Sequence, residues 1–474
     1  MVNLVFSSLT FLYIFLPVCL VLYNLSKNLT YKNAVLLIMS LAFYAYGEPK
    51  WIVVMLATVL VDYLAGKVID QYRGRPMAKA ALITAVVITL GFLAVFKYAN
   101  LFISSINGIF NSEIGLLSIG LPIGISFYTF QALTYVVDVY RGDTRVQHNF
   151  FKLLLYVSLF PQLIAGPIVR YVDIENELNY RKVKAEDFAS GVIRFSVGLT
   201  KKAVLANVAG MLCKKLIDND LSSVSALGMW IGIAAFALQI YFDFSAYSDM
   251  AIGLGYMLGF RFRENFNYPY ISTSISDFWR RWHISLTQFF REYVYIPMGG
   301  NRSNFVRNML IVWLLTGFWH GASWNYLLWG LYYFVFLMIE RVFLGDILKK
   351  LPKFIGWIYS MAVVLVGWVF FYFEDAVKLK YALSIMFGVV KHGVFDPIEK
   401  TIVINFLPFI IIGVIACLPV SRLVKDVLDK LSEKNKAAGV FTDIATAVFV
   451  AFNMFISTAA LVGSSYNPFL YFRF

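Results

Sequence analysis

The chain has 474 residues, of which 60% are hydrophobic and 15% charged, and its net charge is +13. Soluble domains carry about 25% charged residues, so this composition excludes a soluble enzyme. The basic residues cluster between apolar stretches, which indicates contact with lipid headgroups rather than with nucleic acid. The three cysteines lie far apart, and we expect neither a metal site nor a disulfide framework.

The apolar stretches predict an all-α polytopic membrane protein, with roughly 10 to 13 crossings at ~20 residues each. The candidate spans are residues 5–24, 33–47, 51–66, 79–96, 114–139, 150–169, 225–258, 309–339, 354–373, 401–421 and 441–462. No basic residue precedes Lys27, so we expect the first stretch to be a retained span rather than a cleaved signal peptide. Basic loops stay cytoplasmic, and counting from residues 67–79 and 422–436 places both termini outside.

Two of these stretches are interrupted by helix-breaking and polar residues. One reads PIGISFYTFQ over residues 122–131, and the other has prolines at Pro161 and Pro167. Irregular backbone at membrane depth is tolerated where it lines a cavity or is buried in protein. We therefore expect these segments to line a cavity, with Gln131 binding substrate.

The apolar stretch 225–258 carries two carboxylates, Asp243 and Asp249. Carboxylates at this depth need partners. Pairing with Arg280 and Arg281 is the favoured interpretation. The alternative is a role in chemistry or proton handling, for which Asp243 is the candidate.

Residues 278–293 have the pattern of an amphipathic helix, which Ser276 or Asp277 can cap. At 100° per residue one arc is apolar: Phe278, Trp279, Trp282, Leu286, Phe289, Phe290 and Tyr293. The pattern predicts an interfacial helix on the cytoplasmic surface, with His283 at the edge of the arc. The helix is either a simple anchor or a site where Arg280 and Arg281 bind an anionic donor, such as a phosphate or phosphopantetheine group.

The run from Met309 to Ile339 contains no Asp, Glu, Lys or Arg, and His320 lies near its middle. An ionisable residue at membrane depth is a functional-site hypothesis by default, and histidine can take and return protons near neutral pH. The alternative is a packed histidine whose nitrogens bond to neighbouring carbonyls. As one helix the run would measure about 46 Å, against a core of about 30 Å.

Both flanks of this run are basic and look cytoplasmic, at residues 261–307 and 349–353. A single span cannot begin and end on the same side. Gly317 and Gly321 bracket the histidine, so a broken or re-entrant pair of half-helices would resolve the conflict. That arrangement would place His320 at a buried tip.

The chain closes on the sequence NPFLYFRF, residues 467–474. Terminal residues are usually polar and loose unless something holds them. An aromatic tail predicts a segment docked in a groove, and interfacial anchoring is the alternative.

Taken together, these segments resemble the membrane-bound O-acyltransferase (MBOAT) family, most closely its bacterial alginate O-acetyltransferase branch. The stretches that carry the likeness are Pro122–Gly142, Phe160–Tyr171, Tyr241–Gly253, Phe278–Arg302 and Gly317–Gly330. The resemblance implies an MBOAT-like multi-helix fold with a central tunnel and with re-entrant and interfacial helices. It also implies a single integral membrane acyltransferase domain over residues 1–474.

The resemblance assigns roles to particular residues. His320 matches the presumed catalytic base of the family, and His283 matches its second histidine. The tail 469–474 resembles an aromatic motif in a small partner protein of the teichoic-acid D-alanylation enzymes, which makes Tyr471 a candidate transient acyl acceptor. The expected substrate-binding residues are Arg280, Arg281, Trp319, Asp243 and Gln131.

The expected function is transfer of an acyl group, most simply acetyl, from a cytoplasmic thioester such as acetyl-CoA or an acyl-carrier protein. The acceptors would be hydroxyls of an exported or cell-wall polysaccharide, as in alginate O-acetylation, with an extracytoplasmic acyltransferase partner. We expect no bound cofactor, no metal, and a location in the bacterial cytoplasmic membrane.

Three alternatives remain at this stage: a transporter or flippase for a cell-envelope precursor, D-alanyl transfer to teichoic acid, and a glycosyltransferase. Many transporters show internal repeats, and none is evident in this sequence. No D-x-D metal motif supports the glycosyltransferase.

Overall fold

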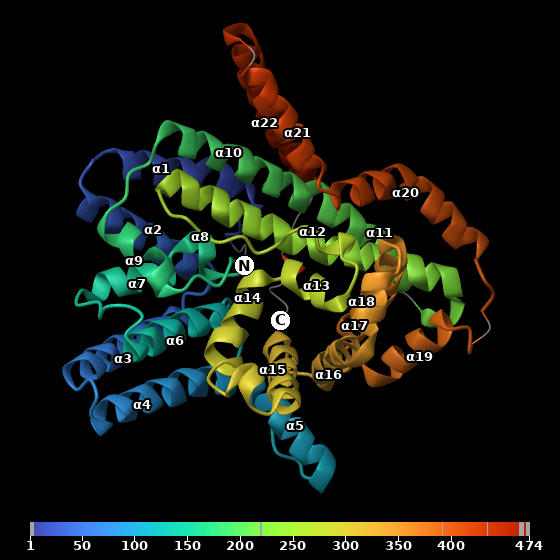
Figure 1. Ribbon diagram of the computed structural model, residues 1–474, viewed down its shortest axis with the longest axis horizontal. Helices are drawn as coiled ribbons and strands as arrows, with labels where there is room; N and C mark the ends of the chain where they lie inside the picture. The colour runs from blue at the N-terminus through green and yellow to red at the C-terminus, as the bar shows by residue number, and fades with distance from the viewer. Residues whose placement is uncertain (1–3, 219, 391, 434, 464–468, 471–474) are drawn as a thin grey trace. The chain divides into compact units, whose positions relative to one another are not determined.

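The computed structural model describes residues 4–218, 220–390, 392–433, 435–463 and 469–470 (Figure 1). Over these ranges the regular structure is helical, without a strand, which confirms the predicted all-α class. The chain forms two compact units, each assembled from segments that are distant in sequence. The prediction of one membrane domain over the whole chain stays a prediction.

The first unit comprises residues 1–195, 247–263 and 461–474. Its helices are α1 (Leu16–Asn24), α2 (Leu29–Gly47), α3 (Ile52–Gln71), α4 (Pro76–Leu93), α5 (Ala99–Phe110), α6 (Ile125–Arg141), α7 (Phe150–Ser158), α8 (Phe160–Leu163), α9 (Tyr171–Asn179) and most of α10 (Ala185–Thr200). A π-helical turn at Phe11–Phe15 leads into α1, and another at Ala94–Tyr98 joins α4 to α5.

The second unit comprises residues 196–246 and 264–460. Its helices are α11 (Asn207–Ile217), most of α12 (Ala226–Leu258), α13 (Ile275–Arg281), α14 (Ile284–Phe290), α15 (Phe305–His320), α16 (Trp324–Ile339), α17 (Gly345–Lys350), α18 (Lys353–Tyr372), α19 (Ala376–Met386), α20 (Pro397–Ala416), α21 (Val420–Ser432) and most of α22 (Lys436–Val462). π-Helical turns occur at Lys201–Ala206, Arg291–Tyr295 and Glu340–Leu344, and 3-10 turns at Leu221–Ser223, Pro269–Ile271 and Gly300–Arg302.

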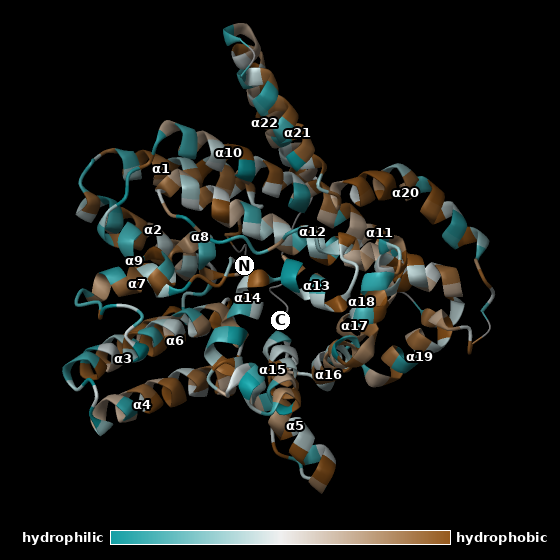
Figure 2. Ribbon diagram, in the orientation of Figure 1, coloured by the Kyte–Doolittle hydropathy of each residue, from teal (hydrophilic) through white to brown (hydrophobic). Residues whose placement is uncertain are grey.

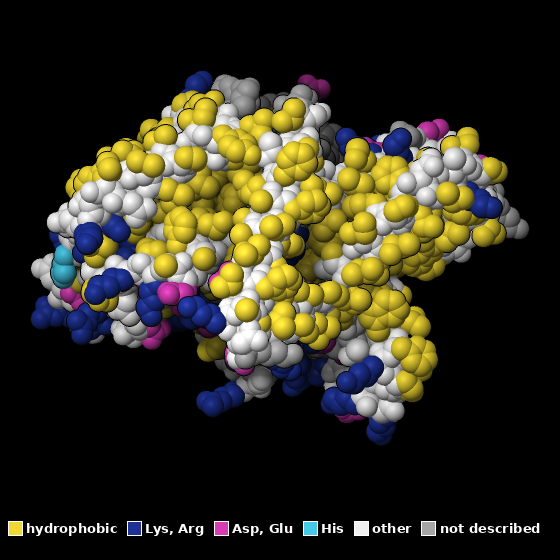
Figure 3. Space-filling view, turned by 90° about the horizontal axis from the view of Figure 1, so that it is seen from above, with side chains coloured by type: hydrophobic (Ala, Val, Ile, Leu, Met, Phe, Trp, Pro, Cys, Tyr) yellow, Lys and Arg dark blue, Asp and Glu magenta, His cyan; other side chains and the backbone are white. Residues whose placement is uncertain are grey.

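Seven helical segments of the described chain are long and apolar enough to cross a membrane. They are Ile52–Gln71, Pro76–Phe110, Ala226–Leu258, Trp324–Lys350, Lys353–Tyr372, Pro397–Ala416 and Lys436–Val462. In Figure 2, α4 and α20 are coloured mainly as hydrophobic, and hydrophobic side chains dominate the surface seen in Figure 3. Such a surface suits contact with lipid.

Two predicted spans are not continuous helices. The stretch 114–139 is irregular up to its N-cap Gly124, where α6 begins, and the stretch 150–169 divides into α7, α8 and an irregular segment. Gly124 has φ +76°, and a Cβ there would lie 2.8 Å from the carbonyl oxygen of Leu163. Only glycine permits both that backbone and that approach. The predicted interruptions are therefore confirmed, and they account for two of the predicted spans that are not among the seven long apolar helices.

The uncharged run 309–339 is broken, as predicted. α15 ends at His320, and α16 begins at Trp324 after a three-residue connection. A Cβ on Gly317 would lie 2.2 Å from the carbonyl oxygen of Tyr326, and one on Gly330 would lie 2.3 Å from that of Trp313. Small residues allow two apolar helices to approach this closely. α15 and α16 therefore form a tightly packed antiparallel hairpin.

The two ends of this hairpin lie together. The guanidinium of Arg341, just after α16, sits over the ring of Phe305, the first residue of α15, at 3.8 Å. Both basic flanks of the run therefore lie at the same end of the hairpin, which removes the topological conflict in the sequence. His320 lies at the opposite end, at the turn.

Candidate active site

His320 is enclosed by aromatic rings of the second unit. Its side chain is 3% exposed. Its ring centroid lies 4.9 Å from that of Trp319, 5.0 Å from that of Trp329 and 5.3 Å from that of Phe371, all in edge-on geometry. The predicted position at a buried tip is thus confirmed, while its chemical role stays a prediction.

The turn after His320 is fixed by close packing. Gly321 has extended backbone, and a Cβ there would lie 2.1 Å from the ring of Tyr326. The Tyr326 ring also packs against Phe371 at 5.1 Å. These contacts leave little freedom at the turn, so they hold the His320 ring in one place.

His283 lies in the same aromatic cluster. It is fully buried, and its ring lies 4.6 Å from that of Phe244 and 5.7 Å from that of Trp319. Trp319 therefore contacts the rings of both histidines. Burial lowers the pKa of His283 to about 3, so its ring is neutral at working pH.

The predicted continuous interfacial helix is wrong. The segment divides into α13 and α14, and His283 joins them with φ +46°. Its apolar arc faces protein instead of lipid: Trp279 packs against Trp313 at 4.8 Å, and Trp282 packs against Trp368 at 5.0 Å. His283 consequently lies in the interior and not at the edge of a surface helix. Aromatic side chains from α15 and α18 cover the apolar arc, whereas the sequence pattern alone favoured lipid as its cover.

The adjacent arginines differ in their environment. Arg281 is held by Asp277, at 3.0 Å from both carboxylate oxygens, and donates to the carbonyl of Asn267 at 3.2 Å. Arg280 is exposed, and no carboxylate of the described chain pairs with it. Arg280 can therefore meet an anion, whereas Arg281 mainly fixes α13.

Glu340 positions α13 relative to the hairpin, a role that sequence reasoning missed. Its carboxylate accepts hydrogen bonds from the backbone N–H of Ile275 at 2.5 Å, and from the N–H and hydroxyl of Ser276 at 2.9 and 2.7 Å. An anion at a helix N-terminus satisfies its unpaired N–H groups and its dipole. The only available signal was that Glu340 is the first charge after the uncharged run.

Both carboxylates of α12 are paired, but not with the arginines expected. Asp243 lies 2.5 Å from the Nζ of Lys202, with both side chains buried in the second unit. Asp249 lies 2.9 Å from Arg194 within the first unit. The expectation of structural pairing is confirmed, and the partners Arg280 and Arg281 are corrected. Arg194 lies in α10 and Lys202 in the π-helical turn that follows it. The cations that pair with α12 therefore come from this segment.

Gln131 is fully buried in α6 of the first unit. Its backbone carbonyl accepts from the hydroxyls of Thr134 and Tyr156, at 2.7 and 3.1 Å. Neither polar atom of its side-chain amide has a hydrogen-bond partner among the described residues. Leaving such an amide unpaired is costly, and the substrate contact of Gln131 stays a prediction.

The C-terminal tail is described only at Phe469 and Leu470, so Tyr471 lies outside the described residues. Phe469 is 1% exposed, and its ring packs edge-on against Tyr247 at 5.1 Å within the first unit. The prediction of a docked tail is confirmed at this residue.

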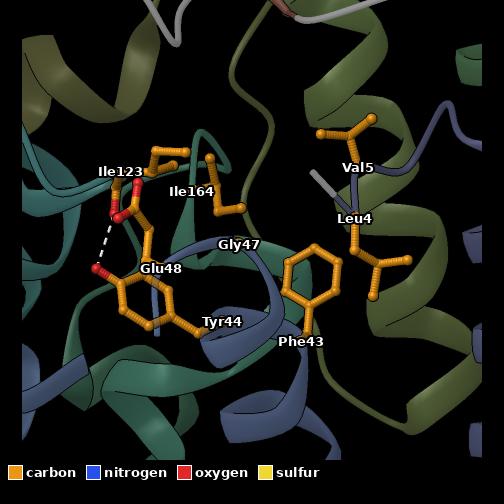
Figure 4. Close-up of a pocket in the computed structure, with 8 residues that line it drawn as sticks. All are labelled: Leu4, Val5, Phe43, Tyr44, Gly47, Glu48, Ile123 and Ile164. Carbon is orange, nitrogen blue, oxygen red and sulfur yellow. Dashed lines mark hydrogen bonds between the residues drawn. The ribbon is translucent and has the colours of Figure 1, made fainter. Parts of the chain in front are cut away.

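A small cavity in the first unit is shown in Figure 4. Its volume of about 10 Å³ is enough for roughly one water molecule. It is lined by Leu4, Val5, Phe43, Tyr44, Gly47, Glu48, Ile123 and Ile164, and the Tyr44 hydroxyl donates to the carbonyl of Ile123 at 3.1 Å. The cavity is too small for a substrate, and neither His283 nor His320 lines it.

The helical fold and its buried histidine pair define the class: a multi-pass membrane enzyme with an ionisable centre inside an apolar unit. The sequence pattern of the membrane-bound O-acyltransferase family matches residues 143–383, and the chain belongs to that family. The matched region contains His283, Trp319 and His320. The chain is thus an O-acyltransferase, and the transporter and glycosyltransferase alternatives fall away.

Individual relatives extend the match over most of the chain. The chain is 43% identical to a probable alginate O-acetylase of Pseudomonas aeruginosa, over 78% of this chain and 72% of the relative. It is 36% identical to a probable alginate O-acetylase of Pseudomonas putida, over 99% of this chain and all of the relative. It is 34% identical to a peptidoglycan O-acetyltransferase of Helicobacter pylori, over 82% of this chain and 80% of the relative.

Proposed function

We propose that this chain moves an acetyl group from a cytoplasmic thioester toward the hydroxyls of an exported or cell-wall polysaccharide, in the bacterial cytoplasmic membrane. The relatives are named for O-acetylation of two different polymers, which supports acetyl as the group and a polysaccharide as the acceptor. The observation that carries the proposal is the placement of His320, buried at the tip of a hairpin and sharing Trp319 with a second histidine.

In the proposed reaction His320 is the general base. An acceptor hydroxyl attacks the thioester carbonyl carbon while His320 takes its proton. The carbon–sulfur bond then breaks, and the imidazolium returns the proton to the leaving thiolate. The aromatic surroundings of His320 have a low dielectric, which strengthens hydrogen bonds to the developing oxyanion. The protein needs no bound cofactor in this scheme, because the activated acyl group arrives on its carrier, acetyl-CoA or an acyl-carrier protein.

The hairpin geometry supports transfer across the membrane. The two ends of the hairpin lie together beside Arg341, and basic ends stay cytoplasmic. The 16 residues of α15 span roughly 24 Å, most of the thickness of the ~30 Å hydrocarbon core. His320 would then lie far from the cytoplasmic end. The proposal therefore includes a tunnel through which the carrier delivers its acyl group from the cytoplasmic side to His320. The acceptor would approach His320 from the opposite side of the membrane.

The overall proposal is tested in cells. We expect a strain lacking this chain to export a polymer without O-acetyl groups, and a plasmid copy to restore them, as measured by mass spectrometry of the isolated polymer. An unchanged acetyl content in the deletion strain would contradict the proposal.

Arg280→Ala is expected to raise the KM for the thioester donor about tenfold and to change kcat less. Arg280 is exposed and unpaired within the described chain, so it can bind the anionic part of the donor. Because that part does not react, the contact would be equally strong in the ground and transition states. Steady-state kinetics with varied donor concentration measure both constants. Arg302→Ala is the control, because Arg302 is also exposed but lies outside α13 and α14. Equal donor KM values in the two variants would remove Arg280 from the donor site.

Arg281→Ala should behave differently, by lowering thermal stability together with kcat. Its partner Asp277 and the Asn267 carbonyl lose their charge-assisted hydrogen bonds. A change confined to the KM for the donor would instead support the role predicted from the sequence, in which Arg281 binds the anionic donor.

Tyr471→Phe is expected to block delivery of acetyl to the polymer while leaving thioester cleavage intact. Phe469, two residues before Tyr471 in the sequence, is buried against Tyr247, which supports a docked tail. In the proposed relay the acyl group passes from sulfur to the phenolic oxygen and then to the partner or polymer. A neutral phenol is a weak nucleophile, so this relay also requires a general base that removes its proton.

The relay is measured by two assays on the same variant: acetyl content of the polymer, and mass spectrometry of the C-terminal peptide for an acyl ester. Tyr140→Phe, an exposed tyrosine at the end of α6, is the matched control. Full polymer acetylation by the Tyr471→Phe variant would reduce the tail to an anchor.

A further inference from the structure

Asn265 lies in the irregular segment between α12 and α13, and it is fully buried. Its side-chain Oδ1 accepts hydrogen bonds from the backbone N–H of Ser285 at 3.1 Å and from the Ser285 hydroxyl at 2.9 Å. The same oxygen lies 3.2 Å from the Nδ1 of His283. Its backbone carbonyl also accepts from the N–H of Ile284 at 3.0 Å. One residue thus holds the first turn of α14 and the histidine ring together.

These contacts decide which ring nitrogen of His283 carries the proton. The Ser285 N–H is an obligate donor, so the Asn265 atom facing it must be the oxygen and not the amide nitrogen. That oxygen can only accept. The Nδ1 of His283 must then donate, and the proton of the neutral ring sits on Nδ1. The other nitrogen, Nε2, carries a lone pair and can only accept a hydrogen bond.

We propose that Asn265 is a positioning residue for acyl transfer: it holds His283 in the Nδ1–H tautomer, so that Nε2 accepts a hydrogen bond from an O–H or N–H group of a substrate. The inference rests on the proposed function and deepens it. Fixing the tautomer of a histidine through the hydrogen bond of its other nitrogen is a general way to set what the ring can do.

The backbone and the packing around His283 fix its ring in one orientation. The residue has φ +46°, a backbone conformation that costs a non-glycine residue energy and that persists where surrounding structure imposes it. Phe244 and Trp319 pack against the ring edge-on, so the ring cannot exchange its two nitrogens by turning over. The amide nitrogen of Asn265 has no hydrogen-bond partner among the described residues, so this side chain offers a ligand a buried donor in addition to the accepting Nε2 of His283.

The tautomer is measured directly by nitrogen NMR of the full-length protein labelled with ¹⁵N in its histidine rings. The chain has four histidines, and the signals of His283 are those lost in a His283→Asn variant. We expect a protonated Nδ1 and a bare Nε2 in the wild-type protein. A protonated Nε2 with a bare Nδ1 would overturn the proposal. This readout needs no turnover, so it stands or falls separately from the acyltransferase reaction.

The functional arm compares substitutions at Asn265. In Asn265→Ala the constraint on Nδ1 is lost, and we expect Nε2 to become protonated in part and kcat to fall about tenfold, the factor that one hydrogen bond is worth. Asn265→Asp keeps an accepting oxygen and should retain the Nδ1–H signal and recover activity relative to alanine. Ser285→Ala, which removes only the hydroxyl donor and keeps the backbone N–H, should leave the tautomer unchanged.

The comparison also separates positioning from simple packing. A loss of activity in Asn265→Ala with an unchanged His283 tautomer and an unchanged melting temperature would contradict the proposal. If both tautomer and activity change, the KM values for the two substrates show which one donates the hydrogen bond to Nε2. A higher KM for the thioester donor indicates its amide N–H, and a higher KM for the polymer indicates its hydroxyl.

Discussion

We expect His320→Ala to lower the rate of acyl transfer by a factor of about 10²–10⁴, the range that a positioned general base contributes. The side chain is buried at the end of α15, with three aromatic rings around it, so the alanine variant loses both the base and some packing. His320→Gln fills more of the same space without a basic nitrogen. We expect both variants to lose transfer to the same extent, although the glutamine variant should melt closer to wild type.

The matched control is His148→Ala. His148 is exposed, and its backbone carbonyl accepts a hydrogen bond from the Tyr63 hydroxyl, while no bond of its ring to a described residue is found. Rates of thioester consumption and melting temperatures of the purified variants provide the comparison. If His320→Gln turned over at the rate of His148→Ala, His320 would be a packed histidine and the general base would have to lie elsewhere.

Gly317→Ala should separate the two helices that carry the site and remove most of the activity. The added methyl group would lie 2.2 Å from the carbonyl oxygen of Tyr326. That atom belongs to the backbone, so it cannot move aside as a flexible side chain could. Overpacking of this kind costs about 1–3 kcal/mol. Because the hairpin also sets the position of Trp319 and His320, we expect a lower melting temperature together with a lower kcat.

Gly91→Ala is the control for this prediction. Gly91 also lies inside an apolar helix, α4, but a Cβ there meets no described atom within 4 Å. Alanine should stabilise that helix by about 0.5–1 kcal/mol. Equal melting temperatures for the two variants would show that the hairpin is not packed as tightly as the structure describes.

The hairpin could be predicted from the sequence because simple length and charge arguments conflicted. One uncharged run was too long for a single span, and both of its flanks were basic. Gly317 and Gly321 marked the place where the run could break. The structure places the break directly after His320. A histidine in such a run was therefore visible as a candidate before any fold was known.

The break between α13 and α14 could not be predicted in the same way. The apolar residues of 278–293 repeat with helical spacing across His283, so periodicity favours one helix. The left-handed backbone of His283, which ends one helix and begins the next, cannot be recognised from that spacing. Periodicity also cannot say whether an apolar arc meets lipid or protein. The aromatic residues Trp313 and Trp368, distant in sequence, decide that question.

Ion pairs and supporting residues were the least predictable part of the candidate site. The sequence showed that Asp243 and Asp249 needed cations, but which cations depends on the neighbours of α12 in space. Glu340 and Asn265 act through backbone groups and a ring nitrogen, and such contacts have no sequence pattern. The roles of Gln131 and Tyr471 stay predictions, the latter because it lies outside the described residues.

Acyl transfer at His320 can be measured with the purified protein alone. The purified wild-type protein in proteoliposomes is given acetyl-CoA with a radiolabelled acetyl group and an oligosaccharide acceptor, beside His320→Gln and His148→Ala. We expect labelled acetyl esters on the acceptor with wild type and His148→Ala, and background label with His320→Gln. Equal ester formation by all three proteins would contradict it.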